Sequence, residues 1–197
     1  MTTIVKDRAL LIQKPSSDLG LVERVAKGDT QALEELYIRY SPVLYTYLFH
    51  LVYEEPIAEE LIQEVFIAVW KSAFRFRKSA AVKTWLFQIA HHLGVSWLRR
   101  KKLYIEYVQN IEQDPLPNMD EVLQEQWIKK VVSTALRRLS VEHRAVLELT
   151  YYYGLSYEET AEIVQCPIGT VKSRISYARR NLDHILRAAG VNSLSGE

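Results

Sequence analysis

The 197-residue sequence is long enough for one medium-sized domain or two small ones, and 48% of its residues are hydrophobic, which predicts a buried core rather than global disorder. The sequence has one cysteine, Cys166, which excludes an intrachain disulfide and a cysteine-cluster metal site. It also lacks a signal-peptide pattern and the run of roughly 18 apolar residues that a membrane span needs. The formal net charge is +1, but the charges are unevenly distributed along the sequence. Residues 65–105 contain nine Lys or Arg and no acid, and residues 103–128 contain six acids and no base. Residues 167–187 contain five bases and one acid. We therefore expect a cytoplasmic protein, not inserted in a membrane, with polyanion-binding surfaces joined by an acidic segment.

Helical periodicity runs through almost the whole sequence, and signals for β-strands are few. In the first half it predicts helices over residues 21–27, 30–40, 42–53, 56–74 and 81–102. In the second half it predicts helices over residues 122–139, 141–153, 157–164 and 167–189. Asp29 or Thr30 can cap the second helix, and Pro56 suits the first turn of the fourth.

An acidic segment with two prolines, NIEQDPLPNMDE at residues 110–121, interrupts this periodicity. Its prolines and its lack of an apolar period are typical of a linker. We therefore predict an all-α protein of two small helical domains joined by an acidic linker. The expected order is a flexible N-terminal lead at 1–20, a first domain at 21–104, the linker at 105–125, a second domain at 126–189 and a tail at 190–197.

The stretch LSYEETAEIVQCPIGTVKSRISYARRNL, residues 155–182, has the features of a helix-turn-helix. Ser156 and Glu159 form a capping-box pattern that starts a short helix, and Pro167 with Gly169 separates it from a second helix. The expected inward residues of the second helix are Val171, Ile175, Ala178 and Leu182. Its candidate DNA-binding residues, suited to guanine edges or phosphates, are Thr170, Lys172, Ser173, Arg174, Tyr177, Arg179 and Arg180. A solvated cationic helix face is the alternative interpretation.

The stretch KTWLFQIAHHLGVSWLRRKK, residues 83–102, combines aromatic residues with cations and contains no acid. Apolar residues four apart predict one core-facing side. We assign Leu86, Ile89 and Leu93 to that side, and Gln88, His91, His92, Val95 and Arg99 to the outward side. Adjacent residues diverge by about 100° on a helix, so the two histidines cannot chelate one metal together. We predict no metal site and no cofactor.

Two neighbouring stretches also suggest binding surfaces. In KSAFRFRKSAAVKTW, residues 71–85, Phe74 and Phe76 alternate with cations, which suits single-stranded nucleic acid because cations follow phosphates while bases rest on rings. The preceding helix, PIAEELIQEVFIAVWKSAF, has more apolar surface than one core face needs, beside carboxylates. This surplus indicates docking on a partner with basic residues, and burial in a helical bundle is the alternative.

Three motifs, AEELIQEVFIAVW, FRFRKSAAVKTWLFQIAHHLGVSWLRRKK and the helix-turn-helix stretch, occur here in the order of a known family. From about residue 21 to residue 186 the sequence resembles a bacterial sigma-70-type factor of the extracytoplasmic function (ECF) group. The resemblance implies two helical domains on a linker, and a protein that directs RNA polymerase to −10 and −35 promoter elements and promotes strand opening without ATP. It implies three partners: core RNA polymerase, through the clamp coiled coil and the flap of its large subunits, promoter DNA, and an anti-sigma factor.

The resemblance also implies roles for residues. The helix that docks on the polymerase clamp is matched by Glu60, Leu61, Gln63, Glu64, Val65, Phe66 and Trp70. The part that recognises and opens the −10 element is matched by Phe74, Arg75, Phe76, Lys83, Trp85, Gln88, His91, His92, Arg99 and Arg100. The −35 reader is matched by the seven candidate DNA-binding residues of the helix-turn-helix. The acidic linker matches a connector that threads toward the active site and RNA exit of polymerase.

The sequence departs from the family pattern in two of its motifs, the −10 helix and the helix-turn-helix. His91 and His92 stand where relatives usually have Arg-Asn, which leaves the base preference at the −10 element open. Gln165 stands where the turn of the helix-turn-helix usually has glycine. A left-handed conformation at that position would cost on the order of 1 kcal/mol.

Two other classes of function stay open. A stand-alone helix-turn-helix regulator would bind duplex DNA without polymerase, but it leaves the AEELIQEVFIAVW helix unexplained. An enzyme acting on nucleic acid would need a metal or nucleophile site, and the carboxylates Glu59, Glu60 and Glu64 have no His or Cys at ligand spacing. We therefore predict that the protein is not an enzyme.

Overall fold

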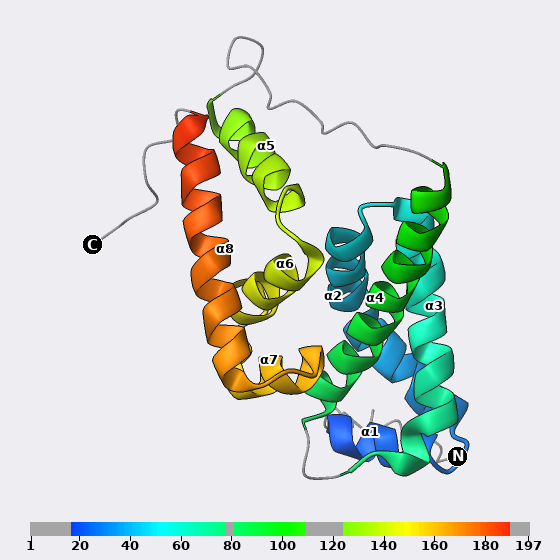
Figure 1. Ribbon diagram of the computed structural model, residues 1–197. Coiled ribbons are helices and arrows are strands. Elements are labelled where there is room, and N and C mark those ends of the chain that lie inside the picture. Colours follow the sequence, from blue (N-terminus) through cyan, green and yellow to red (C-terminus); the bar gives the residue numbers. More distant parts are fainter. Residues whose placement is uncertain (1–16, 78–80, 109–123, 190–197) are drawn as a thin grey trace, which may run out of the picture.

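The computed structural model describes residues 17–77, 81–108 and 124–189. These residues form helices joined by short turns, with no β-strand among them, so the all-α prediction is confirmed (Figure 1). The predicted lead up to residue 16, the linker residues 109–123 and the predicted tail lie outside the described residues. Two of the predicted domain boundaries differ from the helices of the structure. The first helix begins at Asp18, inside the predicted lead, and the helix before the linker continues to Val108, beyond the predicted end of the first domain.

The N-terminal unit packs its helices around one shared core. Its elements are α1 (Asp18–Val25), α2 (Thr30–Val52), α3 (Glu55–Ser72), the 3-10 turn η1 (Ala73–Arg75) and α4 (Val82–Val108). Figure 1 shows α3 and α4 side by side, with α2 packed against both and α1 at the lower end. The unit is therefore a small helical bundle in which α4 is the last helix before the linker.

Two predicted helix starts are confirmed in this unit. The carboxylate of Asp29 accepts hydrogen bonds from the amides of Gln31 and Ala32 at 3.0 and 3.1 Å, which caps α2. Pro56 lies in the first turn of α3, where its missing N–H is not needed.

Helix α2 is continuous through Pro42, so the predicted break before this proline is wrong. A proline inside a helix removes one backbone hydrogen bond and costs about 3 kcal/mol or more. Residues on both sides of it, among them Leu36 and Leu48, are fully buried against the same core. Each buried leucine contributes roughly 1.5–3 kcal/mol, so tertiary packing offsets the local cost of the proline.

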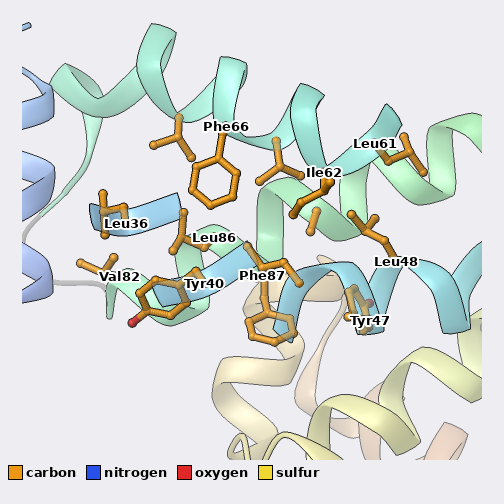
Figure 2. Packing of buried hydrophobic residues seen from close by; sticks show 14 of the residues in the cluster. Leu36, Tyr40, Tyr47, Leu48, Leu61, Ile62, Phe66, Val82, Leu86 and Phe87 are labelled. Atoms are coloured by element: carbon orange, nitrogen blue, oxygen red, sulfur yellow. The ribbon is translucent and has the colours of Figure 1, made fainter. Parts of the chain in front are cut away.

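The core of the N-terminal unit lies between α2, α3 and α4, as Figure 2 shows. Leu48, Leu61 and Leu86 belong to this core, and each is at most 2% exposed. Gly94 lets α4 approach α2 closely, because a Cβ at this position would lie 2.5 Å from a methyl carbon of Leu51. A side chain at position 94 would therefore require Leu51 to shift.

The buried side of α4 is broader than the predicted stripe. Leu86 is buried as predicted, but Ile89 and Leu93 are half-buried, whereas Phe87 and Ala90 are fully buried. The physical reason is that α4 is covered twice, by α2 and α3 of its own unit and by a helix of the C-terminal unit. The sequence pattern of one helix does not reveal this second cover.

The C-terminal unit contains the predicted helix-turn-helix. Its elements are α5 (Gln124–Arg137), α6 (Val141–Leu147), η3 (Glu148–Tyr152), α7 (Tyr157–Val164) and α8 (Ile168–Ala188), of which η3 is a turn of π-helix. The Ser156 hydroxyl accepts a hydrogen bond from the Glu159 amide at 3.1 Å, and the Glu159 carboxylate accepts one from the Ser156 amide at 2.8 Å. The predicted capping box is therefore confirmed at the start of α7.

The turn between α7 and α8 contains a residue in the left-handed region. Gln165 has a φ of 52°, and its amide donates to the carbonyl of Ala161 at the end of α7. A residue with a Cβ adopts this conformation at a cost of about 1 kcal/mol. The strain predicted for a non-glycine residue at this position is thus present.

The two units pack directly on each other. Leu149 and Tyr153 of the C-terminal unit are buried in the same cluster as the core residues of α2 and α4. The ring of Tyr153 lies 5.7 Å from the ring of Tyr47 and 4.8 Å from that of Phe87. Figure 2 shows Tyr47 and Phe87 on the side of the core that borders the C-terminal unit. The C-terminal unit also has apolar clusters of its own, one of them around Val171.

Replacing Gln165 by glycine should raise the free energy of unfolding by about 1 kcal/mol, because glycine adopts a positive φ without the steric cost of a Cβ. Equilibrium denaturation with urea measures the change. Glu162→Gly is the matched control, because Glu162 is exposed inside α7 and its replacement should lower the free energy of unfolding by roughly 0.5–1 kcal/mol. A loss of stability in Gln165→Gly would show that the turn is not strained.

Candidate nucleic-acid interface

Helix α8 contains the seven residues of the helix-turn-helix that were predicted to contact DNA. Val171, Ile175 and Ala178 are buried, as predicted, and Leu182 is half-buried. The exposed residues of the opposite side are Lys172, Ser173, Tyr177, Arg179 and Arg180, while Thr170 and Arg174 are half-buried. The helix therefore has one apolar side on the unit and one accessible side with cations and hydroxyl groups.

Neighbouring elements orient two of these side chains. Tyr177 stacks on His143 of α6, with ring centroids 4.6 Å apart and an interplanar angle of 28°. The guanidinium of Arg174 donates to Sγ of Cys166, in the turn before α8, at 3.8 Å. Side chains held in this way lose less conformational freedom when they bind a ligand.

The segment after α3 contains two aromatic rings, of which Phe74 is exposed and Phe76 is half-buried. Phe74 is 65% exposed, and the guanidinium of Arg75 lies 5.1 Å from the centre of its ring. Phe76 is half-buried, and its ring lies 5.0 Å from that of Trp85. Phe74 and Arg75 thus form an accessible aromatic and cationic pair, whereas Phe76 and Trp85 pack against the core.

Two side chains of α4 that were predicted to contact DNA are bound by the C-terminal unit. The ammonium of Lys83 donates to the carbonyl of Tyr153 at 2.8 Å, and the amide of Gln88 donates to the carbonyl of Glu162 at 3.3 Å. The expectation that Gln88 faces solvent is therefore corrected. It lies outside the core of its own unit, but α7 covers it.

His91 is turned into the protein, which corrects the prediction that it faces outward. Its Nδ1 lies 2.7 Å from the hydroxyl oxygen of Tyr47. Burial, and then the neighbouring His92, lower the pKa of His91 to about 4, so its imidazole is neutral at pH 7. His92 is exposed, as are Arg99 and Arg100 further along α4, so these three remain accessible candidates for DNA contacts.

Helix α3 has an exposed apolar strip beside polar residues, as predicted. Ile67 is 52% exposed and Trp70 is 38% exposed. Glu60 and Gln63 are exposed, and Glu64 is half-buried. An apolar surface with carboxylates at its border suits a partner that combines apolar and basic residues.

Three residues of α3 predicted to dock on a partner belong to the core instead. Leu61, Val65 and Phe66 are 2%, 0% and 5% exposed. They lie on the side of α3 that packs against α2 and α4, so a partner cannot reach them while the unit is folded. Their predicted role as contact residues is corrected to a supporting one.

Two exposed apolar residues of α2, one of which packs against α3, were missed by the sequence reasoning. Tyr37 is 41% exposed and Ile38 is 68% exposed. The ring of Tyr37 packs edge-on against that of Phe66, with centroids 4.8 Å apart, which brings α2 next to α3 here. The sequence did contain a signal for this exposed surface. The apolar residues Tyr37 and Ile38 lie between Leu36 and Tyr40, which both face inward, so they must point elsewhere on the helix.

Within the part of the chain that the structure describes, no three His, Cys, Asp or Glu side chains come together in a way that could hold a metal ion. None of the described helices combines the length and apolar character needed to cross a membrane.

Comparisons with known proteins match both units. The sigma-70 region 2 family matches residues 36–104, and the sigma-70 region 4 family matches residues 129–182. The RNA polymerase sigma-H factor of Pseudomonas aeruginosa is 31% identical over 181 residues, which cover 86% of this chain and 94% of that protein. The chain belongs to the sigma-70 family. The ECF RNA polymerase sigma-E factor of Escherichia coli is 30% identical over 179 residues, which cover 85% of this chain and 93% of that protein. The family resemblance seen in the sequence motifs is therefore confirmed.

Solved structures agree with this assignment. The sigma factor RpoE of Bartonella quintana, in complex with the anti-sigma factor NepR, matches with a TM-score of 0.63 and 28% identity over 78% of this chain and 96% of that chain. CnrH, in complex with the cytosolic domain of CnrY, has the same fold with a TM-score of 0.66 and 22% identity over 88% of this chain and 99% of that chain. This ECF sigma factor is a transcription-initiation factor.

Acidification should destabilise this sigma factor through His91. Between about pH 6.5 and pH 4 the unfolded chain binds a proton at this imidazole and the folded chain does not, because burial lowers the pKa of His91 to about 4. The free energy of unfolding should therefore fall as the pH falls through this window, by up to roughly 3 kcal/mol. Urea denaturation at several pH values measures the slope, which should be smaller in His91→Asn.

The matched control for this prediction is a histidine on another helix. His184 is exposed on α8, so His184→Asn should leave the pH dependence of the free energy of unfolding as it is in the parent protein. Equal slopes in the parent protein and His91→Asn would contradict the buried, neutral state of His91.

Proposed function

We propose that this sigma factor divides promoter recognition between its two units, with α8 reading the −35 element and the N-terminal unit capturing the −10 strand. One observation carries the proposal: a capped helix-turn-helix with exposed cations is joined to a second unit that exposes an aromatic ring beside a cation. The first arrangement suits the major groove of duplex DNA. The second suits unpaired bases.

At the −35 element, the accessible side of α8 supplies the contacts. Arg179 and Arg180 can donate paired hydrogen bonds to guanine or bind phosphates, and Lys172 can bind phosphates. Tyr177 offers an aromatic edge that is already oriented by its stack on His143. Anchored contacts of this kind favour tighter binding because fewer rotamers must be fixed when the DNA binds.

At the −10 element, Phe74 with Arg75 is the proposed site for a flipped base and its phosphate. His92, Arg99 and Arg100 lie on α4 and extend the cationic surface. Flipping a base costs a few kcal/mol of stacking and pairing, which stacking on an aromatic ring offsets. Strand opening can thus proceed without ATP.

The exposed strip of α3 is the proposed surface for the clamp coiled coil of core RNA polymerase. Ile67 and Trp70 supply apolar contact area, and Glu60 supplies a carboxylate for basic residues of the partner. Tyr37 and Ile38 of α2 enlarge this surface. The C-terminal unit is proposed to meet the flap of polymerase.

An anti-sigma factor is the proposed regulator, because the solved structure of the sigma factor RpoE is a complex with the anti-sigma factor NepR. We also propose that the protein acts in the cytoplasm, with polymerase, and that it has no enzymatic activity of its own. A stand-alone DNA-binding regulator is a weaker proposal, because it gives the exposed strip of α3 no role.

Run-off transcription with bacterial core RNA polymerase on a library of DNA fragments tests the proposed function. Selective transcripts should appear only when the protein is added, and their aligned upstream sequences should contain two conserved elements. Failure to bind core polymerase would contradict the proposal and favour the stand-alone regulator.

In the same assay, Arg180→Ala should lower selective transcription and reduce the salt dependence of promoter binding by about one unit of the log–log slope, because one phosphate or base contact is lost. Arg187→Ala is the matched control. Arg187 is exposed on the same helix but pairs with Asp183 at 2.9 Å, one turn away, and should have little effect. Equal losses in both variants would argue for a general charge effect instead of groove contacts.

Truncating the exposed strip of α3 should weaken binding to core polymerase. Trp70→Ala should raise the Kd for core polymerase about tenfold or more, because buried aromatic side chains dominate protein interfaces. Fluorescence anisotropy of the labelled protein measures this Kd. Leu19→Ala is the control, since Leu19 on α1 is 37% exposed, close to the 38% of Trp70, but lies outside the strip. An unchanged Kd in Trp70→Ala would assign the polymerase contact to another surface.

A further inference from the structure

We propose that His143, on α6, is a positioning residue for the −35 element, because its ring fixes Tyr177 of α8 and thereby sets the base preference at one base pair. The proposal rests on the proposed function of α8 as the reader of that element. It adds a residue outside the reading helix to those that determine which promoter is chosen. The observation that carries it is a chain of contacts from the cap of α6 to the accessible side of α8.

The imidazole of His143 is anchored at the start of α6. Its Nδ1 lies 2.7 Å from the hydroxyl oxygen of Ser140, the N-cap residue of this helix. The same oxygen accepts a hydrogen bond from the backbone amide of His143 at 3.4 Å. One turn further along, Val146 and Leu147 are buried in an apolar cluster with residues of α8, and α6 packs beside α8 in Figure 1. Residues three and four apart share a side of a helix, so His143 lies at the edge of this packed contact.

Tyr177 meets this anchored ring on the side of α8 that is proposed to face DNA. Its side chain is 52% exposed, and its ring stacks on that of His143 with centroids 4.6 Å apart. Thr170 and Ser173 precede it by seven and four residues, so the three lie along one face of the helix. Because His143 covers one face of the phenol ring, the ring edge and the hydroxyl group are what Tyr177 offers to a base pair.

The stack restricts where the end of the Tyr177 side chain can lie. A long side chain on a helix uses two χ1 rotamers, near about 180° and about −60°, and these place the ring over different parts of the helix surface. Stacking on His143 selects one of them. A ring held in one place contacts one base pair, whereas an unheld ring adapts to several sequences, and adaptable surfaces are typical of promiscuous binding. His143 therefore raises the discrimination that Tyr177 provides.

A purely structural role for this pair makes a different prediction. The contact between α6 and α8 already contains a buried cluster that includes Val146, Val171 and Ile175, and Tyr177 is not part of it. If the stack served only to hold α6 on α8, loss of the His143 ring would lower stability and leave the base preference unchanged. A positioning role requires that the base preference change at the position that Tyr177 reads.

Run-off transcription with core RNA polymerase, on a library randomised across the −35 element, tests the proposal when the transcripts are sequenced. Tyr177→Ala should lower the discrimination between bases at one position at least about fivefold. His143→Ala should lower it at the same position at least about twofold, because the freed ring must be ordered on binding. His143→Phe keeps a ring for the stack and should restore most of the preference of the parent protein. In the Tyr177→Ala background, His143→Ala should add no further loss.

His50→Ala is the matched control. His50 is also a half-buried histidine beside an exposed tyrosine, since its ring lies 6.3 Å from that of Tyr152, but neither residue belongs to α8. Its replacement should leave the base preference at every position of the element as it is in the parent protein. Circular dichroism of each variant confirms that it is folded.

The outcomes separate this proposal from the proposed function. An unchanged base preference in His143→Ala, beside a changed one in Tyr177→Ala, would overturn the positioning role. Losses spread evenly over all positions in both variants would also overturn it, since they would assign the pair to packing or to phosphate contacts. Either result would leave the sigma function supported by the selective transcripts of the parent protein. Absence of selective transcripts with the parent protein would overturn the proposed function, and this proposal with it.

Discussion

The structure depends on the position of α4 between two layers. On one side it packs with α2 and α3, where Leu86 is fully buried and Gly94 permits the close approach. On another side it meets α7, through Gln88 and Lys83. Side chains leave a helix in all directions, so one helix can build a core, hold a neighbouring unit and expose cations at its far end. Whatever moves the C-terminal unit therefore changes the accessible surface of α4 without changing its core.

Charges that are segregated along the sequence are only partly brought together in the fold. In the basic stretch that ends α3 and begins α4, Lys83 contacts the C-terminal unit, whereas Lys71, Arg75 and Arg77 are exposed. The near-neutral net charge of +1 is the sum of opposed segments of the sequence. Within the described residues, α8 and the exposed end of α4 keep their cations toward solvent. The protein can thus be balanced in total charge while it retains two surfaces that attract a polyanion.

The parts of the fold that could be predicted from the sequence are those fixed by neighbours along the chain. The caps at Asp29 and Ser156 each involve residues two or three positions apart, so their patterns identify them directly. The orientation of His91 could not be predicted, because the tyrosine that receives it lies 44 residues earlier in the sequence. The continuity of α2 through Pro42 likewise depends on burial against other helices. The family motif in α3 identified a functional helix but could not distinguish its contact residues from its supporting ones. Three of the motif residues are buried in the core: Leu61, Val65 and Phe66.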